Sequence, residues 1–263
     1  MKDIETDDQI IERLRVRFEC LEDMTRAVKG GKVRSMIVSG SPGVGKSFGI
    51  EKVLGYHDLF ATIANDQSLK KYEIVKGAMS PLGLYVKLHQ FKNDKNVLVI
   101  DDCDNIYSDE QSLNLLKTCL DTGKKRVVSW NYDSYKLKDE GVPNSFEFNG
   151  GIIFITNVDF DHVKSRKIKS HLKALESRCH FINLTCHSNR EKLLRIRQIV
   201  NDGMLDGHGI DNEKKLDVVD FICDNHTALR ELSLRTVIKA ADLASSFPDR
   251  WKDVAKITLM KSR

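Results

Sequence analysis

Residues 40–47, Gly-Ser-Pro-Gly-Val-Gly-Lys-Ser, constrain this chain more than any other stretch. The pattern GxxxxGK[ST] follows a short apolar run, residues 35–39, and precedes a stretch with helical character, residues 48–54, which is the context that it requires. Gly40, Gly43 and Gly45 allow backbone angles that turn successive N–H groups inward. The following helix adds the positive end of its dipole. The stretch, called the phosphate loop below, is therefore predicted to hold a polyphosphate.

Each part of the phosphate loop has an expected role. Lys46 is expected to reach the β and γ phosphates, and the hydroxyl of Ser47 is expected to bind Mg²⁺. The other residues expected to contact the nucleotide are Gly40, Ser41, Pro42, Gly43, Val44, Gly45 and Phe48. The competing interpretation, a glycine-rich turn with a chance lysine, is disfavoured by the flanking strand and helix.

Composition and charge permit this interpretation without demanding it. With 263 residues, 41% of them apolar and 30% charged, the chain can form one α/β core and a smaller second domain. The net charge of +4 tolerates nucleic acid as a partner but does not predict it. No apolar run approaches the ~18 residues that cross a membrane, and the first residues do not resemble a signal peptide. We expect a cytoplasmic protein without a membrane partner.

The six cysteines form no CxxC pair, which is typical of a reducing compartment. Cys179, His180, Cys186 and His187 could be imagined as zinc ligands. The residues between the two pairs have the pattern of a strand, whose alternate side chains point to opposite faces. We therefore do not expect a zinc site there.

Apolar runs alternate with helical patterns over the first 184 residues. A helix is expected over residues 6–29, with Thr6 and Gln9 as a capping box, and others over 82–91 and from Ser108 and Gln111 to about residue 122. Strands are expected at residues 35–39, 72–76, 97–100, 151–156 and 181–184. This alternation predicts parallel strands joined by crossover helices. From Ser188 onward only helical segments follow, so we expect an α/β domain at residues 1–184 and a helical domain at 185–263.

A second motif consists of the apolar strand at residues 97–100 followed by Asp101 and Asp102. In ATPases with a phosphate loop, the first carboxylate orients Mg²⁺ and the second polarises the attacking water. Ser47 and Asp101 are thus the expected metal ligands, and Asp102 the expected base, with Asp104 as a second candidate. Taken without the phosphate loop, this motif could also be an ordinary acidic turn at the end of a strand.

With these two motifs, the chain resembles the AAA+ ATPase family. The resemblance implies a three-layer α/β/α domain with a five-stranded parallel sheet, a small helical lid, and ATP and Mg²⁺ as cofactors. Asn157 matches the family's sensor 1, and residues 176–181, Glu-Ser-Arg-Cys-His-Phe, resemble the box that carries the arginine finger of clamp loaders. Arg178 would then act on a neighbouring subunit's nucleotide, which implies a head-to-tail homo-oligomer, a hexameric ring or a spiral. A surface salt bridge is the alternative for Arg178.

The family's lid arginine, sensor 2, has two candidates, Arg230 and Arg235, and we prefer Arg235. The other would be an ordinary surface charge. The chain departs from the family in two places. First, Asp102 replaces the usual glutamate, so the sequence does not predict whether ATP hydrolysis is fast or slow. Second, residues 76–81 lack the aromatic residue with which protein-unfolding relatives grip polypeptide.

Residues 124–150 are predicted to form an inserted hairpin, because residues 126–130 and 145–148 alternate like strands around a polar turn. In the helicase and initiator branch of the family, a hairpin at this place lines the central pore. Trp130, Tyr132, Lys136 and Lys138 would suit contacts with DNA or RNA bases and phosphates. A surface hairpin without a role in nucleic-acid binding is an equally weighted alternative.

The chain also resembles the compact AAA+ ATPases of double-stranded DNA bacteriophages. The first hypothesis is an oligomeric ATPase that acts on nucleic acid in replication, recombination or packaging, in the host bacterial cytoplasm if it is phage-encoded. The second is a protein remodeller of the MoxR-like or chaperone type. The third is a switch that binds ATP and hydrolyses it negligibly.

Overall fold

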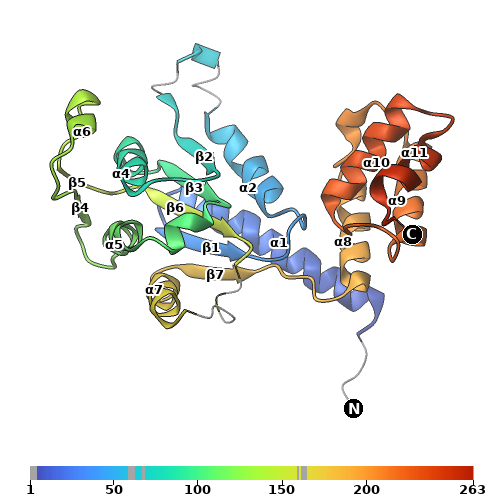
Figure 1. Cartoon of the computed structure of the whole chain (residues 1–263), viewed down its shortest axis with the longest axis horizontal. Coiled ribbons are helices and arrows are strands. Elements are labelled where there is room, and N and C mark those ends of the chain that lie inside the picture. Colours follow the sequence, from blue (N-terminus) through green and yellow to red (C-terminus); the bar gives the residue numbers. More distant parts are fainter. Residues whose placement is uncertain (1–4, 59–62, 67–68, 159, 161–164, 263) are drawn as a thin grey trace. The chain divides into compact units, whose positions relative to one another are not determined.

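The computed structural model describes residues 5–58, 63–66, 69–158, 160 and 165–262, and its elements group into two units (Figure 1). The sheet unit comprises Phe18–Gly40 and Lys46–Leu184. The helical unit comprises Met1–Arg17, Ser41–Gly45 and Thr185–Arg263. Helix α1 (Asp7–Lys29) and the phosphate loop contribute residues to both units, which are described separately below.

A parallel sheet forms the centre of the sheet unit. Its strands are β1 (Ser35–Ser39), β2 (Tyr72–Lys76), β3 (Val97–Asp101), β6 (Gly151–Thr156) and β7 (His180–Asn183), in the order β2-β3-β6-β1-β7. Every residue of β1, β3 and β6 is buried, as expected for strands covered on both faces. The predicted α/β class with five parallel strands is confirmed.

The helices of the sheet unit include α2 (Lys46–Leu54), α4 (Pro81–Gln90), α5 (Glu110–Cys119) and α7 (Arg166–Glu176), with the short 3₁₀ turns η1 (Gly55–Asp58) and η3 (Asp104–Tyr107). The predicted cap of α5 is wrong by one residue. Asp109, in an extended conformation, accepts a hydrogen bond of 2.6 Å from the N–H of Ser112, whereas Ser108 ends η3. A carboxylate at the cap also complements the helix dipole.

Residues 127–147 form a separate two-stranded ribbon. Strand β4 (Val127–Ser129) pairs antiparallel with β5 (Ser145–Glu147). The connection differs from the predicted polar turn, because it contains the short helix α6 (Tyr135–Asp139), capped by Ser134. The only buried side chain of α6 belongs to Leu137, and five residues are too few to show a helical period in the sequence.

The helical unit contains α8 (Asn189–Asn201), η5 (Asp206–His208), α9 (Asn212–Asn225), α10 (Leu234–Ser246) and α11 (Trp251–Leu259). Its own apolar core includes Phe221 and Trp251, whose rings lie 5.1 Å apart. Among the described residues, none of the helices combines the length and the hydropathy that a transmembrane segment requires.

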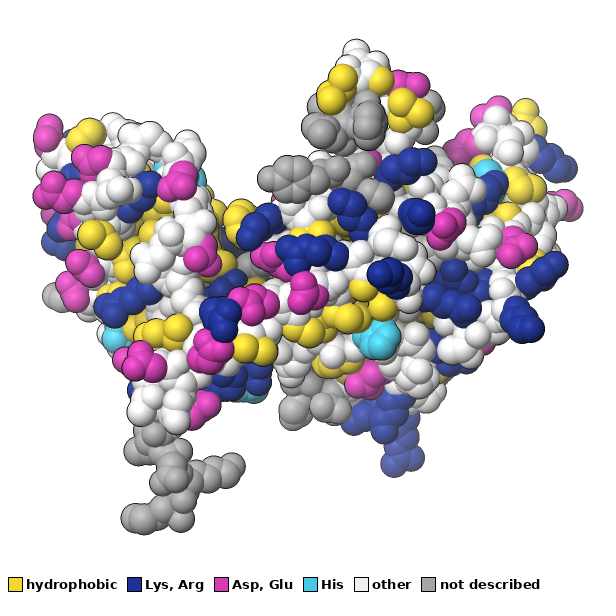
Figure 2. All heavy atoms as spheres, turned by 180° about the vertical axis from the view of Figure 1, so that it is seen from behind, with side chains coloured by type: hydrophobic (Ala, Val, Ile, Leu, Met, Phe, Trp, Pro, Cys, Tyr) yellow, Lys and Arg dark blue, Asp and Glu magenta, His cyan; other side chains and the backbone are white. Residues whose placement is uncertain are grey.

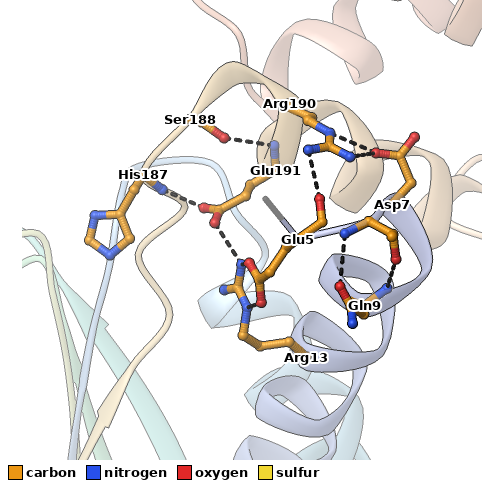
Figure 3. A network of polar contacts seen from close by, with 9 residues as sticks. Glu5, Asp7, Gln9, Arg13, His187, Ser188, Arg190 and Glu191 are labelled. Atoms are coloured by element: carbon orange, nitrogen blue, oxygen red, sulfur yellow. Dashed lines mark hydrogen bonds and ion pairs between the residues drawn. The ribbon is translucent and has the colours of Figure 1, made fainter. Parts of the chain in front are cut away.

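A polar network joins the beginning of α1 to the beginning of α8 within the helical unit (Figure 3). The predicted capping box is confirmed, since Thr6 and Gln9 exchange hydrogen bonds of 2.9 and 3.3 Å. Arg13 then pairs with both Glu5 and Glu191, at 2.7 and 2.8 Å. Glu191 also accepts a hydrogen bond of 2.6 Å from the backbone N–H of His187. The start of α8 is thereby fixed by residues almost two hundred positions away.

Candidate nucleotide site

Three neighbouring strands end at the same edge of the sheet and carry the predicted site residues. The order β3-β6-β1 places β6 between the other two. Because parallel strands share an edge at their carboxyl ends, Asp101 and Asp102 at the end of β3, Asn157 after β6 and Lys46 after β1 meet there. This edge is where open α/β sheets bind ligands.

Ser47 and Asp101 already touch. The Ser47 hydroxyl donates a hydrogen bond of 2.9 Å to Oδ2 of Asp101, whose carboxylate is buried at 4% exposure. A serine oxygen and a carboxylate in contact form a hard, oxygen-only ligand set. The two residues predicted to hold Mg²⁺ therefore fit that ion.

Lys46 is buried at 6% exposure, so its charge needs acceptors. Its Nζ donates to the carbonyl oxygen of Gly40 and to Oδ1 of Asn157, both at 2.7 Å. The Nδ2 group of Asn157 donates in turn to Oδ1 of Asp102 at 2.8 Å. Asn157 thus connects Lys46 with the candidate base.

Asp102 has a left-handed backbone, with φ of 52°, which is uncommon and costly for a residue other than glycine. Its N–H donates to the carbonyl oxygen of Ile155, and its side chain is exposed. The fallback base Asp104 is half-buried and accepts a hydrogen bond of 2.9 Å from Thr156. Of the two carboxylates, Asp102 is the one in contact with Asn157 and open to water.

The sequence interpretation missed Lys76, the last residue of β2. Its Nζ lies 3.5 Å from Oδ2 of Asp101 and 3.2 Å from Oε1 of Glu51. Partial burial disfavours the charge, but Glu51 and Asp101 outweigh it and raise the pKa of Lys76. The signal was available only through strand order, because Lys76 and Asp101 are register partners in adjacent parallel strands.

In the helical unit, residues 41–45 contact the start of α10. Gly43 has φ of 68°, and its carbonyl oxygen accepts a hydrogen bond of 2.9 Å from the N–H of Leu234. A Cβ atom added to Gly43 would lie 2.5 Å from Cβ of Ser233. Arg235 follows at once and is exposed, whereas Nε of Arg230 donates to the carbonyl oxygen of Met260 at 2.8 Å. Of the two candidates for sensor 2, Arg235 adjoins the contact with the loop.

Arg178 lies at the opposite end of the strands from the phosphate loop. The Ser35 hydroxyl, at the start of β1, donates to the Arg178 carbonyl oxygen at 3.3 Å, whereas Gly40 follows the end of β1. Five residues of strand separate these positions, which is about 17 Å. The Arg178 side chain is half-buried, and Nη1 donates to the carbonyl oxygen of Ala174 at 2.7 Å.

Of the remaining predicted residues, Phe48 is 48% exposed on α2. In the ribbon, the ring of Trp130 lies 5.7 Å from that of Tyr85 and 5.5 Å from that of Tyr132, and Tyr132 is itself exposed. Lys136 and Lys138 are exposed on α6, with Lys136 3.7 Å from Glu140. No group of three or more His, Cys, Asp or Glu side chains suited to a metal ion occurs among the described residues.

The chain resembles one curated protein across most of its length. It is 35% identical over 246 residues to an uncharacterized 36.7 kDa protein from the nrdC-mobD intergenic region of Enterobacteria phage T4, covering 92% of this chain and 73% of the relative. No protein-family model matches.

Solved structures with a similar fold include a replication initiation protein and an ORC2 protein. Domain III of the replication initiation protein DnaA from Thermotoga maritima matches with a TM-score of 0.52 and 13% identity, over 93% of this chain and 91% of that one. The ORC2 protein of Aeropyrum pernix in its ADP form matches with a TM-score of 0.50 and 13% identity, over 92% and 67%. At this identity the likeness concerns the fold alone.

Proposed function

The chain belongs to the same family as the phage T4 protein and shares its fold with DnaA domain III and the ORC2 protein, and from that premise we propose that it is an AAA+ ATPase that binds Mg²⁺ and ATP and hydrolyses ATP. The observation that carries the proposal is the chain of contacts from Lys46 through Asn157 to Asp102, beside the pair Ser47 and Asp101. These groups serve phosphate binding, water activation and metal binding in one place.

Each residue has a physical task in this proposal. Lys46 neutralises phosphate charge, and its acceptors Gly40 and Asn157 hold the ammonium group in position. Ser47 and Asp101 hold Mg²⁺, which supplies Lewis-acid stabilisation of phosphate oxygens. Asp102 accepts a proton from the attacking water, and Asn157 orients that carboxylate. The ADP form of the ORC2 protein supports a nucleotide ligand for this fold.

The proposed site is completed by a second copy of the chain. Arg178 lies about five strand residues from its own phosphate loop, and this distance supports contact with a neighbour's nucleotide in place of its own. A head-to-tail contact of this kind closes into a ring or winds into a spiral. Nη1 of Arg178 donates to the carbonyl oxygen of Ala174, which leaves its other N–H groups for a phosphate. We assign Arg235 to the nucleotide of its own chain, because it follows Leu234, whose N–H donates to Gly43 of the phosphate loop.

The proposed work of this oligomer is on nucleic acid. Two comparisons support this proposal. The fold neighbour from Thermotoga maritima is a replication initiation protein, and the sequence relative is a protein of phage T4. Residues 76–81 carry no aromatic side chain of the kind that grips polypeptide, which disfavours a protein remodeller.

The test is phosphate release from ATP by purified protein, with and without Mg²⁺ and with and without single- and double-stranded DNA. Wild type is expected to turn over only with Mg²⁺, and DNA is expected to stimulate it. Lys46→Ala should lose binding, and Asp102→Asn should retain ATP binding without turnover. Tight ATP binding with the same slow hydrolysis in wild type and Asp102→Asn would instead identify a nucleotide switch.

A further inference from the structure

The edge of the sheet opposite the candidate nucleotide site is strongly basic. The loops that lead into β1, β2, β3 and β4 are residues 30–34, 70–71, 92–96 and 121–126, and together they hold nine Lys or Arg residues and two Asp residues. Over the whole chain, 42 Lys and Arg residues stand against 38 Asp and Glu residues. The excess positive charge is therefore concentrated at these loops, called the basic edge below.

The four loops form one continuous surface. The N–H of Val97 donates to Lys71 O at 2.8 Å, which joins the loops before β2 and β3. Nη1 of Arg34 donates to the carbonyl oxygens of Asp121 and Gly123 at 2.9 and 3.1 Å, which joins the loops before β1 and β4. Figure 2, seen from behind, shows Lys and Arg side chains gathered at the right-hand end of the sheet unit, with fewer Asp and Glu side chains among them.

Arg126 is the buried centre of the basic edge, at 6% exposure. Its guanidinium donates to Cys119 O at 3.0 Å and Gly150 O at 3.2 Å and lies 5.2 Å from the ring centre of Phe148. Among the described residues no carboxylate forms an ion pair with it. Burial, together with the charge of Arg34, lowers the pKa of Arg126. A buried cation with only neutral acceptors favours an incoming anion.

Arg126 and Arg34 both line a hollow of about 290 Å³ in the sheet unit. The hollow also borders Gly31, Asp94 and the backbone at Gly150. Planar guanidinium groups match the oxygens of a phosphate, and exposed lysines around them act as additional point charges. The hollow with its rim therefore has the chemistry of a phosphate-binding surface.

A polymer of phosphates fits better than a single anion. The order β2-β3-β6-β1 spreads the loops across four adjacent strands, roughly 15 Å at the usual strand spacing. Nucleic acid presents one charge per ~3.4 Å of each strand, so several phosphates can face this edge at once. The ribbon is a poorer candidate, since Asp133, Asp139 and Glu140 outnumber Lys136 and Lys138 around α6.

We propose that the basic edge, centred on Arg34, Arg126, Lys124 and Lys125, binds the phosphate backbone of nucleic acid. The proposal deepens the proposed work on nucleic acid, but it does not depend on ATP hydrolysis. It places the nucleic acid at the end of the strands opposite the candidate nucleotide site. The proposed contacts are to the phosphates of the nucleic acid, so they do not discriminate between base sequences.

The test compares two matched double variants of the full-length protein. Lys124→Ala/Lys125→Ala removes two exposed lysines that make no side-chain hydrogen bond or ion pair within the described residues, so the fold is preserved. Lys136→Ala/Lys138→Ala removes two exposed lysines from the ribbon. Binding of labelled single- and double-stranded oligonucleotides is measured by anisotropy at several salt concentrations, beside basal ATP turnover and oligomer size.

The first variant is expected to weaken binding on the order of 10-fold and to reduce the slope of log K against log salt by about 0.9 per lost contact on duplex or about 0.7 on single strands. The second is expected to change binding less than 2-fold, and both should keep basal turnover. The reverse pattern, or no binding by wild type, would overturn the proposal even if ATP is hydrolysed. Tighter binding of polyglutamate than of DNA would also overturn it, because the partner would then be an acidic protein.

Discussion

Asn157 accepts a hydrogen bond of 2.7 Å from Lys46, and this contact connects the proposed phosphate-binding lysine to the candidate base, because the same amide donates to Asp102. A change in the position of Lys46 can therefore shift the Asn157 amide and, through it, the carboxylate of Asp102.

Asn157→Ala should reduce kcat about 100-fold and leave ATP affinity within a few-fold, because Lys46 keeps the Gly40 carbonyl oxygen whereas Asp102 loses its orienting donor. Steady-state phosphate release and binding of a fluorescent ATP analogue measure the two quantities. Equal losses in both would mean that Asn157 serves only to hold Lys46.

Lys76→Met should lower the Mg²⁺ concentration needed for half-maximal turnover by roughly 3- to 10-fold. The Lys76 ammonium lies 3.5 Å from Asp101 and competes with the metal for that carboxylate, an effect of about 1 kcal/mol in a solvated site. A Mg²⁺ titration of turnover measures it, and Lys76→Arg, which keeps the charge, is the control. A higher Mg²⁺ requirement in Lys76→Met would contradict competition.

Gly43→Ala should abolish tight ATP binding. A left-handed backbone at φ of 68° costs a Cβ residue ~1 kcal/mol or more, and the new atom would collide with Ser233 at 2.5 Å. Calorimetric titration with ATP checks the loss. The double variant Gly43→Ala/Ser233→Gly removes the collision and should recover part of the affinity. If the double variant recovers no ATP affinity, the loss is due entirely to the backbone conformation at residue 43 and not to the collision with Ser233.

Glu191→Gln should destabilise the protein by about 1.5–3 kcal/mol, the usual contribution of a hydrogen bond to a charged group. Burial alone would raise the pKa of Glu191, but Arg13 and the His187 N–H outweigh it, so the pKa is lowered. The stabilisation is present above the ordinary glutamate pKa and disappears as pH falls through the lower folded value. Urea unfolding at neutral and acidic pH measures it, and the difference between wild type and variant should shrink in acid. A constant difference would exclude the charge as the cause.

Local patterns in the sequence predicted the buried strands and the cap of α1, because these features depend on neighbours in the chain. The buried runs of β1, β3 and β6 and the capping box at Thr6 are of this kind. Lys76 was missed because its contact with Asp101 requires the strand order. The basic edge was missed for the same reason, since its loops are scattered over about a hundred residues and meet only when the parallel strands align.

Mixing two inactive variants tests whether Arg178 of one subunit completes the nucleotide site of the next. Arg178→Ala subunits keep Lys46 but lack the finger, and Lys46→Ala subunits lack the lysine but keep Arg178. In a randomly mixed head-to-tail oligomer, about a quarter of the interfaces would combine an intact site with an intact finger. We predict that phosphate release by the equimolar mixture clearly exceeds that of either variant alone. A mixture that stays at the level of the separate variants, while wild type is active, would contradict an arginine supplied by the neighbouring subunit.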